Sequence, residues 1–292
     1  MENIDRIVFG DNQFFGINHM SQEKSQQLAE KFYDINSIYR VYDIAIEAGI
    51  DAIMLNSNQR AEEICTHFRQ NQQKYGHLKW YPSIPYPHKY ANIVAEKGIF
   101  PAFNEILFSN NTASGVLGMI TKGASAVLFK DAIKILHMLV DIEMKMFNGL
   151  NVKVVFLQNV ITDLLLGYDI KLIFEEYCNY IRKKYNVLPG FITLNLPHLV
   201  NKLNEWNIHD VVICSSINKI GFTMCPGIEA YEKTIRENDI EKIQIMAMST
   251  LASGAIPPKE AYEYVKSQNI QSIVFGASSK KNIEESTQLI LS

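Results

Sequence analysis

Short apolar, β-branched runs alternate along the chain with longer stretches in which apolar residues return at helical spacing. This alternation is typical of repeated βαβ units that build a parallel sheet. Eight runs predict strands, over residues 6–10, 51–55, 78–84, 153–157, 191–194, 210–214, 243–248 and 272–275. Helices are expected between them, for example over 37–48, 170–184 and 258–267. The pattern predicts an α/β fold, a (β/α)8 TIM barrel that forms a single domain over residues 1–292.

Residues 98–123 interrupt this regular pattern. Residues 99–103 are a further apolar run and a candidate for a ninth strand, and residues 110–123 are rich in Gly, Ser, Thr and Asn. Loops longer than roughly 12–15 residues are uncommon unless they bind a ligand, cover a site or are disordered. We interpret the segment as an insertion over the barrel mouth, and a disordered connector is the alternative.

The composition narrows the function classes. Hydrophobic residues make up 47% of the 292 residues and charged residues 20%, which allows a sizeable core in an ordinary globule. A net charge of −3 provides no drive toward nucleic acid or anionic membrane. The four cysteines show neither CxxC spacing nor a dense framework, so reduced thiols fit better than a zinc ribbon or a disulfide scaffold.

The sequence also carries no targeting or membrane signal. Glu2, Asp5 and Arg6 stand where a signal peptide would have its apolar stretch, and no apolar run approaches the roughly 18 residues of a transmembrane helix. We therefore expect a cytoplasmic protein that acts on a small molecule and has no nucleic-acid or membrane partner. The sequence leaves its oligomeric state open.

Amide side chains gather at the predicted strand ends, where TIM barrels carry their functional groups. Five of these ends carry Asn or Gln. The candidate substrate-binding residues are Asn12, Gln13, Asn56, Asn58, Tyr86, Gln158, Asn159, Asn195 and His198. Amides donate and accept hydrogen bonds without charge, so a ring of them suits a polyhydroxylated or carbonyl-bearing ligand better than a metal ion. The alternative is that Asn is simply favoured in turns.

Three histidines, His19, His88 and His198, stand in loops that follow odd-numbered strands. They would either converge on a metal ion or supply one acid/base imidazole, unless they are ordinary loop residues. Their spacing matches no metal signature, so we assign no metal site and take His19 and His88 as catalytic candidates. Lys89 is a third candidate, as a charge anchor or, if buried, a Schiff-base nucleophile; a solvated surface lysine is the alternative.

Two glycine-containing loops follow the last two predicted strands: STLASG at 249–254 and GASSK at 276–280. They resemble the loops of the aldo-keto reductase superfamily, Ser-Pro-Leu-x-x-Gly after strand seven and Gly-Ala-Ser after strand eight, which hold the phosphate side of NADP. The first loop has threonine where that family has proline. The resemblance implies a cofactor- or phosphate-binding set of Ser249, Gly254, Gly276, Ser278, Ser279 and Lys280.

Physical chemistry agrees with this implication, since glycine lets the backbone approach an anion and a helix N-terminus offers unpaired amides. The alternative is ordinary turn chemistry, with Ser278 or Ser279 capping the last helix. Two weaker similarities to the same family occur earlier in the chain. Residues 47–58 resemble its second strand, and residues 191–208 resemble its fifth strand and helix, where Asn195 falls on an asparagine that holds nicotinamide.

The catalytic tetrad of that family is not recognisable here. The family uses an Asp and a Tyr after strand two, a Lys on strand three and a His on strand four. Asn56 stands where the aspartate is expected, the loop that follows lacks the tyrosine, and strand three has no lysine in place. The histidine position falls on Gln158 or Asn159. Cys214, which replaces a cofactor-binding glutamine, is expected to be a small core residue.

These observations leave three functions open. Reduction of a carbonyl needs a proton donor with a tuned pKa. Without the tetrad we first expect a non-redox lyase, isomerase or hydrolase that acts on a polar metabolite, phosphorylated or not, with His19 or His88 as the acid/base group. The first alternative is an NAD(P)-dependent oxidoreductase with another donor, such as Tyr86 with Lys89. The second is a non-catalytic binding barrel, favoured by an amide-rich mouth. The cofactor is left undetermined, with NAD(P) as the candidate.

Overall fold

The computed structural model describes residues 2–15, 22–86 and 126–292, and in this part of the chain nine strand segments form one sheet. The segments are β1 (Ile7–Phe9), β2 (Ala52–Asn56), β3 (Lys79–Ile84), β4 (Asn151–Val152), β5 (Val154–Leu157), β6 (Leu188–Thr193), β7 (Val211–Ser216), β8 (Ile243–Met248) and β9 (Ser272–Phe275). Their order is β2-β1-β9-β8-β7-β6-β5-β3-β4, and a further pairing of β2 with β3 closes the sheet. The insertion predicted over 98–123 lies outside the described residues.

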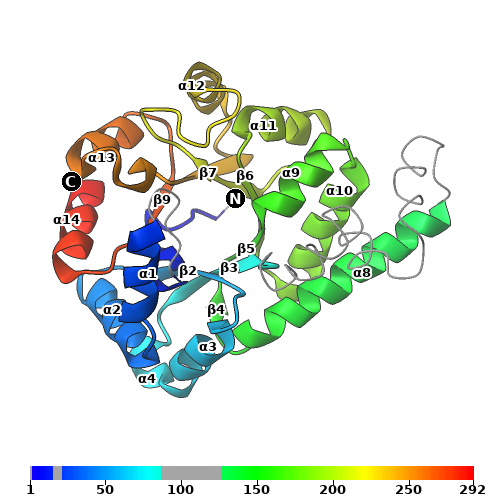
Figure 1. The fold of residues 1–292 in the computed structure, drawn as a ribbon. Coiled ribbons are helices and arrows are strands. Elements are labelled where there is room, and N and C mark those ends of the chain that lie inside the picture. The colour runs from blue at the N-terminus through cyan, green and yellow to red at the C-terminus, as the bar shows by residue number, and fades with distance from the viewer. Residues whose placement is uncertain (1, 16–21, 87–125) are drawn as a thin grey trace.

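The closed sheet is a parallel eight-stranded barrel. β4 and β5 flank Lys153 and both pair with β3, so together they occupy one position in the ring. Every pairing is parallel, from β1 beside β9 around to β2 beside β3. The (β/α)8 TIM barrel predicted from the sequence is therefore confirmed, and helices surround the ring of strands (Figure 1).

The longer helices lie outside the barrel, as the apolar stripes along them require. They are α1 (Gln22–Lys31), α2 (Ile35–Glu47), α3 (Ala61–Gln70), α8 (Ala126–Met144), α9 (Asn159–Gly167), α10 (Lys171–Tyr180), α11 (Leu196–Glu205), α12 (Ile228–Glu237), α13 (Pro258–Lys266) and α14 (Lys280–Leu291). The short α4 (Gln72–Tyr75) and the 3-10 turns η1 (Asn12–Phe15) and η5 (Ala252–Gly254) join them. None of the helices in the described ranges is both long and apolar enough to cross a membrane.

Two hydrophobic layers hold the barrel together. The inner layer fills the ring with side chains such as Met54, Tyr81, Phe156 and Met246, and the outer layer packs the strands against the helices. Gly190 is required by the inner layer, because a Cβ at this position would lie 2.5 Å from the ring of Phe156. Cys214 belongs to the inner layer, as expected for a core residue, and burial raises the pKa of its thiol.

The N-terminal end of the barrel is closed by the first residues of the chain. Gln244 accepts a hydrogen bond from the backbone N of Ile4 at 2.9 Å and donates one to the carbonyl of Glu2 at 2.9 Å. Tyr81 donates from inside the barrel to the carboxylate of Asp5 at 2.5 Å. In TIM barrels this end serves stability, so ligand chemistry is expected at the opposite end, where the strands finish.

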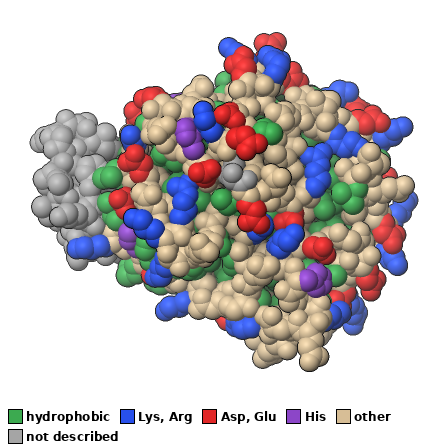
Figure 2. Space-filling model, turned by 180° about the vertical axis from the view of Figure 1, so that it is seen from behind, with side chains coloured by type: hydrophobic (Ala, Val, Ile, Leu, Met, Phe, Trp, Pro, Cys, Tyr) green, Lys and Arg blue, Asp and Glu red, His purple; other side chains and the backbone are tan. Residues whose placement is uncertain are grey.

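The outer surface carries charges of both signs. On the face seen from behind, Lys and Arg side chains are interspersed with Asp and Glu rather than gathered in a patch of one sign (Figure 2). This distribution agrees with the small net charge of −3.

Candidate functional site

A buried carboxyl group, Asp11, lies at the C-terminal end of the barrel, directly after β1 and the glycine that follows it. Asn56, the last residue of β2, donates to it twice, from the backbone N to Oδ2 at 2.9 Å and from Nδ2 to Oδ1 at 2.5 Å. Burial raises the pKa of Asp11 to about 6, although the hydrogen bonds from Asn56 favour the charged form. Asp11 therefore titrates close to neutral pH, and the sequence analysis did not single it out.

Two amides connect Asp11 to the next strands of the ring. Gln158, which follows β5, donates from Nε2 to Oδ1 of Asn56 at 2.5 Å. Asn56 lies beside Ser83 in the register between β2 and β3. Asn58 donates to Asp11 Oδ2 at 3.4 Å and to the carbonyl of Asn56 at 3.1 Å. Three of the predicted binding residues, Asn56, Asn58 and Gln158, thus come together around one carboxyl group.

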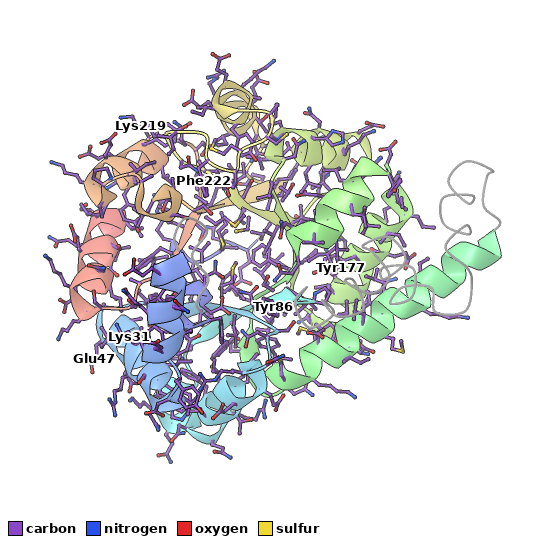
Figure 3. All side chains as sticks on the ribbon, in the orientation of Figure 1. Lys31, Glu47, Tyr86, Tyr177, Lys219 and Phe222 are labelled. Carbon is purple, nitrogen blue, oxygen red and sulfur yellow. The ribbon has the colours of Figure 1, made fainter. Side chains whose placement is uncertain are left out.

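Tyr86 lies just beyond the end of β3, near the centre of the ring of strands (Figure 3). Its backbone N donates to Ser57 Oγ at 3.0 Å, which ties the end of β3 to the loop after β2. Burial, and then the negative charge of Asp11, raise the pKa of its hydroxyl. Tyr86 is therefore protonated at neutral pH and lies close enough to Asp11 to respond to its charge.

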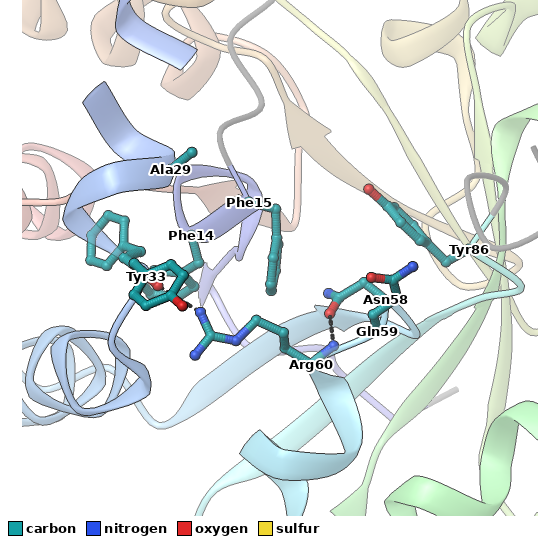
Figure 4. Close-up of a pocket in the computed structure, with 9 residues that line it drawn as sticks. Phe14, Phe15, Ala29, Tyr33, Asn58, Gln59, Arg60 and Tyr86 are labelled. Carbon is teal, nitrogen blue, oxygen red and sulfur yellow. Dashed lines mark hydrogen bonds between the residues drawn. The ribbon is translucent and has the colours of Figure 1, made fainter. Parts of the chain in front are cut away.

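A cleft of about 550 Å³ opens beside these residues, between η1, α1 and the loop after β2 (Figure 4). Its aromatic lining residues are Phe14, Phe15, Phe32, Tyr33 and Tyr86. Its polar lining residues are Asn58, Gln59 and Arg60. Clefts of this size with mostly apolar walls and a few polar groups are typical binding sites for small molecules.

The two loops that resemble cofactor-binding loops lie after β8 and β9. Ser249, Ser253 and Gly254 all have left-handed backbone, with φ of 53°, 57° and 92°. A Cβ at Gly254 would meet nothing within 4 Å, so the space above this glycine is open. Gly276 is different, because a Cβ there would lie 2.1 Å from Oε1 of Gln13. Close packing of Gln13 thus explains this glycine without any anion.

Cationic groups surround the N-terminus of α14. Ser279 caps this helix by accepting from the backbone N of Asn282 at 3.3 Å, which is the capping role that the alternative interpretation expected. Lys31, which lies on α1 (Figure 3), donates to the carbonyl of Ser278 at 2.6 Å. Lys280 begins the helix and lies 3.7 Å from the carboxylate of Glu284. Both the helix dipole and the positive charge of the lysines favour an anion at this helix end. Sequence reasoning missed Lys31, whose position depends on the tertiary fold.

The remaining predicted residues are not brought into this cluster. Asn195 caps α11 by accepting from the backbone N of His198 at 3.2 Å, and the side chain of His198 is exposed on that helix. Asn12 is exposed in η1 and Asn159 begins α9 half-buried. In the described part of the chain, the side chains that hydrogen-bond to Asp11 are those of Asn56 and Asn58, and not these four.

The three residues predicted to be catalytic, His19, His88 and Lys89, lie outside the described residues. Their roles stay predictions. The part of the chain that the structure describes holds no group of three or more metal-ligating side chains, and a metal site involving His19 or His88 is not tested by this observation.

Comparison with known proteins adds to this picture. No family model matches the chain, and neither does any curated protein sequence. A Pseudomonas aeruginosa structure assigned to the aldo-keto reductases superposes with a TM-score of 0.57 at 11% identity, covering 99% of this chain and 92% of that one. An aldo-keto reductase of the silkworm Bombyx mori in complex with NADP gives 0.54 at 12% identity, covering 98% and 84%. One from Bacillus halodurans gives 0.53 at 11% identity, covering 98% and 87%.

At these identities the likeness establishes the fold: the chain is an aldo-keto-reductase-like TIM barrel over nearly its whole length. The resemblance that the sequence carried mainly in its last fifty residues thus extends to the whole architecture. The neighbours are enzymes and are reductases by name.

Proposed function

We propose that this protein is an NAD(P)-dependent oxidoreductase that interconverts a carbonyl and a hydroxyl group on a small polar molecule, with Tyr86 as the proton donor. This proposal replaces the non-redox reaction. Two independent features support it: the correspondence with reductase barrels, one of them solved with NADP, and a barrel mouth that carries acid–base groups on one side and a cationic helix end on the other.

The observation that carries the proposal is that Tyr86 lines the same cleft as Asn58, whose side chain donates to Asp11 at 3.4 Å. A carbonyl oxygen gains negative charge as it is reduced and needs a donor that still holds its proton at neutral pH. The Tyr86 hydroxyl holds its proton at neutral pH, as an ordinary tyrosine does, and burial and the charge of Asp11 raise its pKa further. Asp11 itself is 2% exposed and is hydrogen-bonded by Asn56 and Asn58. Its role in the proposal is electrostatic, because its charge acts on the Tyr86 hydroxyl.

The cofactor would lie along the opposite side of the mouth. The loop after β8, with its open space above Gly254, and the N-terminus of α14 would hold its phosphate groups, with Lys31 and Lys280 supplying positive charge. Bound NAD(P) supplies or accepts a hydride. The residues of this chain orient the substrate oxygen toward Tyr86 and fix Asp11 through Asn56 and Gln158.

The proposal is tested by titrating the protein with NADPH and NADP while following NADPH and tryptophan fluorescence. We expect saturable binding. In Tyr86→Phe we expect the Kd for NADPH to stay within about twofold and kcat/KM with a carbonyl substrate to fall by about 10²-fold or more, the usual scale of general-acid catalysis. Tyr264→Phe is the matched control, since Tyr264 on α13 donates to Glu232. Failure of NADPH and NADP to bind would refute the proposal and restore the non-redox reaction.

A further inference from the structure

The cleft next to Tyr86 has a rigid aromatic floor and an aromatic rim open to solvent. Phe14 and Phe32 form the floor; they are 2% and 1% exposed, and their rings meet edge to face with centroids 5.1 Å apart. Phe15 and Tyr33 form the rim. Phe15 is half-buried and Tyr33 is 88% exposed, so both rings are available for contact with a ligand. An exposed aromatic ring beside a cleft offers a flat apolar surface for a planar ligand group.

Arg60 is the cation of this cleft and is held at two points. Its Nη1 donates to the carbonyl of Phe32 at 2.6 Å, and its backbone N donates to Asn58 Oδ1 at 2.9 Å. Its Nε lies 3.8 Å from the carboxylate of Glu63, beyond hydrogen-bonding distance. A guanidinium carries five N–H donors in a fixed fork, so donors remain after the bond to Phe32. The side chain is thus oriented in advance for a ligand.

The charges around the cleft favour an anion. Among its described lining residues there is one charged side chain, Arg60, and no carboxylate. Asp11 is buried behind Asn58, and the side chain of Glu63 is 53% exposed, so water and salt screen its charge. Helix α3 begins directly after Arg60, but Glu62 and Glu63 in its first turn offset its dipole, so the positive charge at this end is that of Arg60.

We propose, on the basis of the oxidoreductase function above, that the substrate is a ring-bearing carboxylate. Its carboxylate pairs with Arg60, because the guanidinium fork matches the planar geometry of a carboxylate. Its ring packs against Phe15 and Tyr33, and its reacting oxygen faces Tyr86. In Figure 4 the Arg60 guanidinium and Tyr33 lie at one end of the cleft and Tyr86 at the other, so a ligand that spans the cleft reaches both.

The test is isothermal titration calorimetry of the full-length protein with two stable probes, 4-(hydroxymethyl)benzoate and the uncharged benzyl alcohol. We expect the benzoate to bind at least about tenfold more tightly, the effect of one charge-assisted pair worth about 1.4 kcal/mol. Arg60→Met should abolish this preference and leave benzyl alcohol binding within about twofold. Equal affinity of the wild type for both probes, or an unchanged preference in Arg60→Met, would overturn the proposal.

Two further variants keep the test decisive. Arg236→Met removes an exposed arginine from α12 and should leave the preference unchanged. Tyr33→Ala removes a side chain that is 88% exposed, so the fold does not depend on it; both probes should bind several-fold more weakly, and unchanged binding of both would contradict the aromatic role of the rim. NADPH titration of the same samples separates the two proposals: lost NADPH binding with the carboxylate preference intact refutes the oxidoreductase and not the anionic cleft.

Discussion

Replacing Asp11 by asparagine tests the electrostatic core of the site. Burial raises the pKa of the Asp11 carboxyl from 3.8 to about 6, so at neutral pH the folded protein holds a carboxylate that burial disfavours. Each pKa unit corresponds to about 1.4 kcal/mol, so the shift amounts to about 3 kcal/mol. Because the group is buried, solvent screening takes little from this figure.

The sign of the pH dependence follows from proton binding. Between pH 3.8 and about 6 the folded state keeps a proton on Asp11 that the unfolded state has lost. Stability is therefore fully present below the lower value and is lost as the pH rises through the upper one. The asparagine in Asp11→Asn does not titrate, so it contributes no pH dependence to the stability of the variant. Asn56 donates to both carboxylate oxygens of Asp11, so the NH2 group of an asparagine at position 11 would face one of these donors. A buried donor left without an acceptor costs about 1–3 kcal/mol.

The assay is urea unfolding of wild type and Asp11→Asn, followed by tryptophan fluorescence at about pH 4 and pH 7.5. We expect the variant to be less stable at the lower pH and equal or more stable at the higher pH, with the stability difference changing by about 2.4 kcal/mol, most of the full shift, because pH 4 still lies just above the unfolded pKa. Asp51→Asn, at a side chain that is 57% exposed, is the control for general effects of charge removal. A difference that stays constant across this range would show that the Asp11 pKa is not raised.

Three further predictions concern the other side of the mouth. Gly276→Ala should lower stability by about 1 kcal/mol, because its Cβ would lie 2.1 Å from Gln13 Oε1 and the side chain would have to move away and lose its hydrogen bond to the carbonyl of Gly10; Gln13→Ala in the same chain should remove this effect, and the melting temperatures of the four combinations check this. Ser279→Ala should lower stability by about 1 kcal/mol through loss of the α14 cap, measured by urea unfolding. Lys31→Met should weaken NADPH binding several-fold in a fluorescence titration and Lys259→Met, at an exposed side chain on α13, should not; equal affinities would remove Lys31 from the cofactor site.

The barrel was predictable because parallel strands buried on both faces leave continuous apolar runs in the sequence. The predicted strands over 243–248 and 272–275 coincide with β8 and β9. The sixth segment was harder: β6 begins at Leu188, three residues before the predicted start at 191. The beginning of β6 was not predicted because it contains Pro189 and Gly190, and proline and glycine are uncommon inside strands. Gly190 is present for packing, because Phe156 occupies the space that a side chain would need.

The site was less predictable than the fold because its key property is burial. Asn56, Asn58 and Gln158 were identified from their places at strand ends, and the structure joins them in one network. The sequence pattern around Asp11 does not distinguish a buried acid from a solvated turn residue. Its burial depends on Asn56, which approaches because β1 and β2 pair in the closed ring. Contacts of this kind, between residues that are far apart in the sequence, leave no local sequence pattern.

The same network contains the residues that occupy two positions of the missing tetrad. Where the resemblance expects an aspartate and a histidine, this chain has Asn56 and Gln158, and these two amides hydrogen-bond to each other. The negative charge is nevertheless present in the mouth, since Asp11 brings it from the neighbouring strand. A carboxylate near Tyr86 raises the pKa of the hydroxyl, whereas a lysine partner would lower it. Tyr86 thus holds its proton at neutral pH, as the proposed donor must, and its raised pKa makes it a weaker acid than a tyrosine beside a lysine would be.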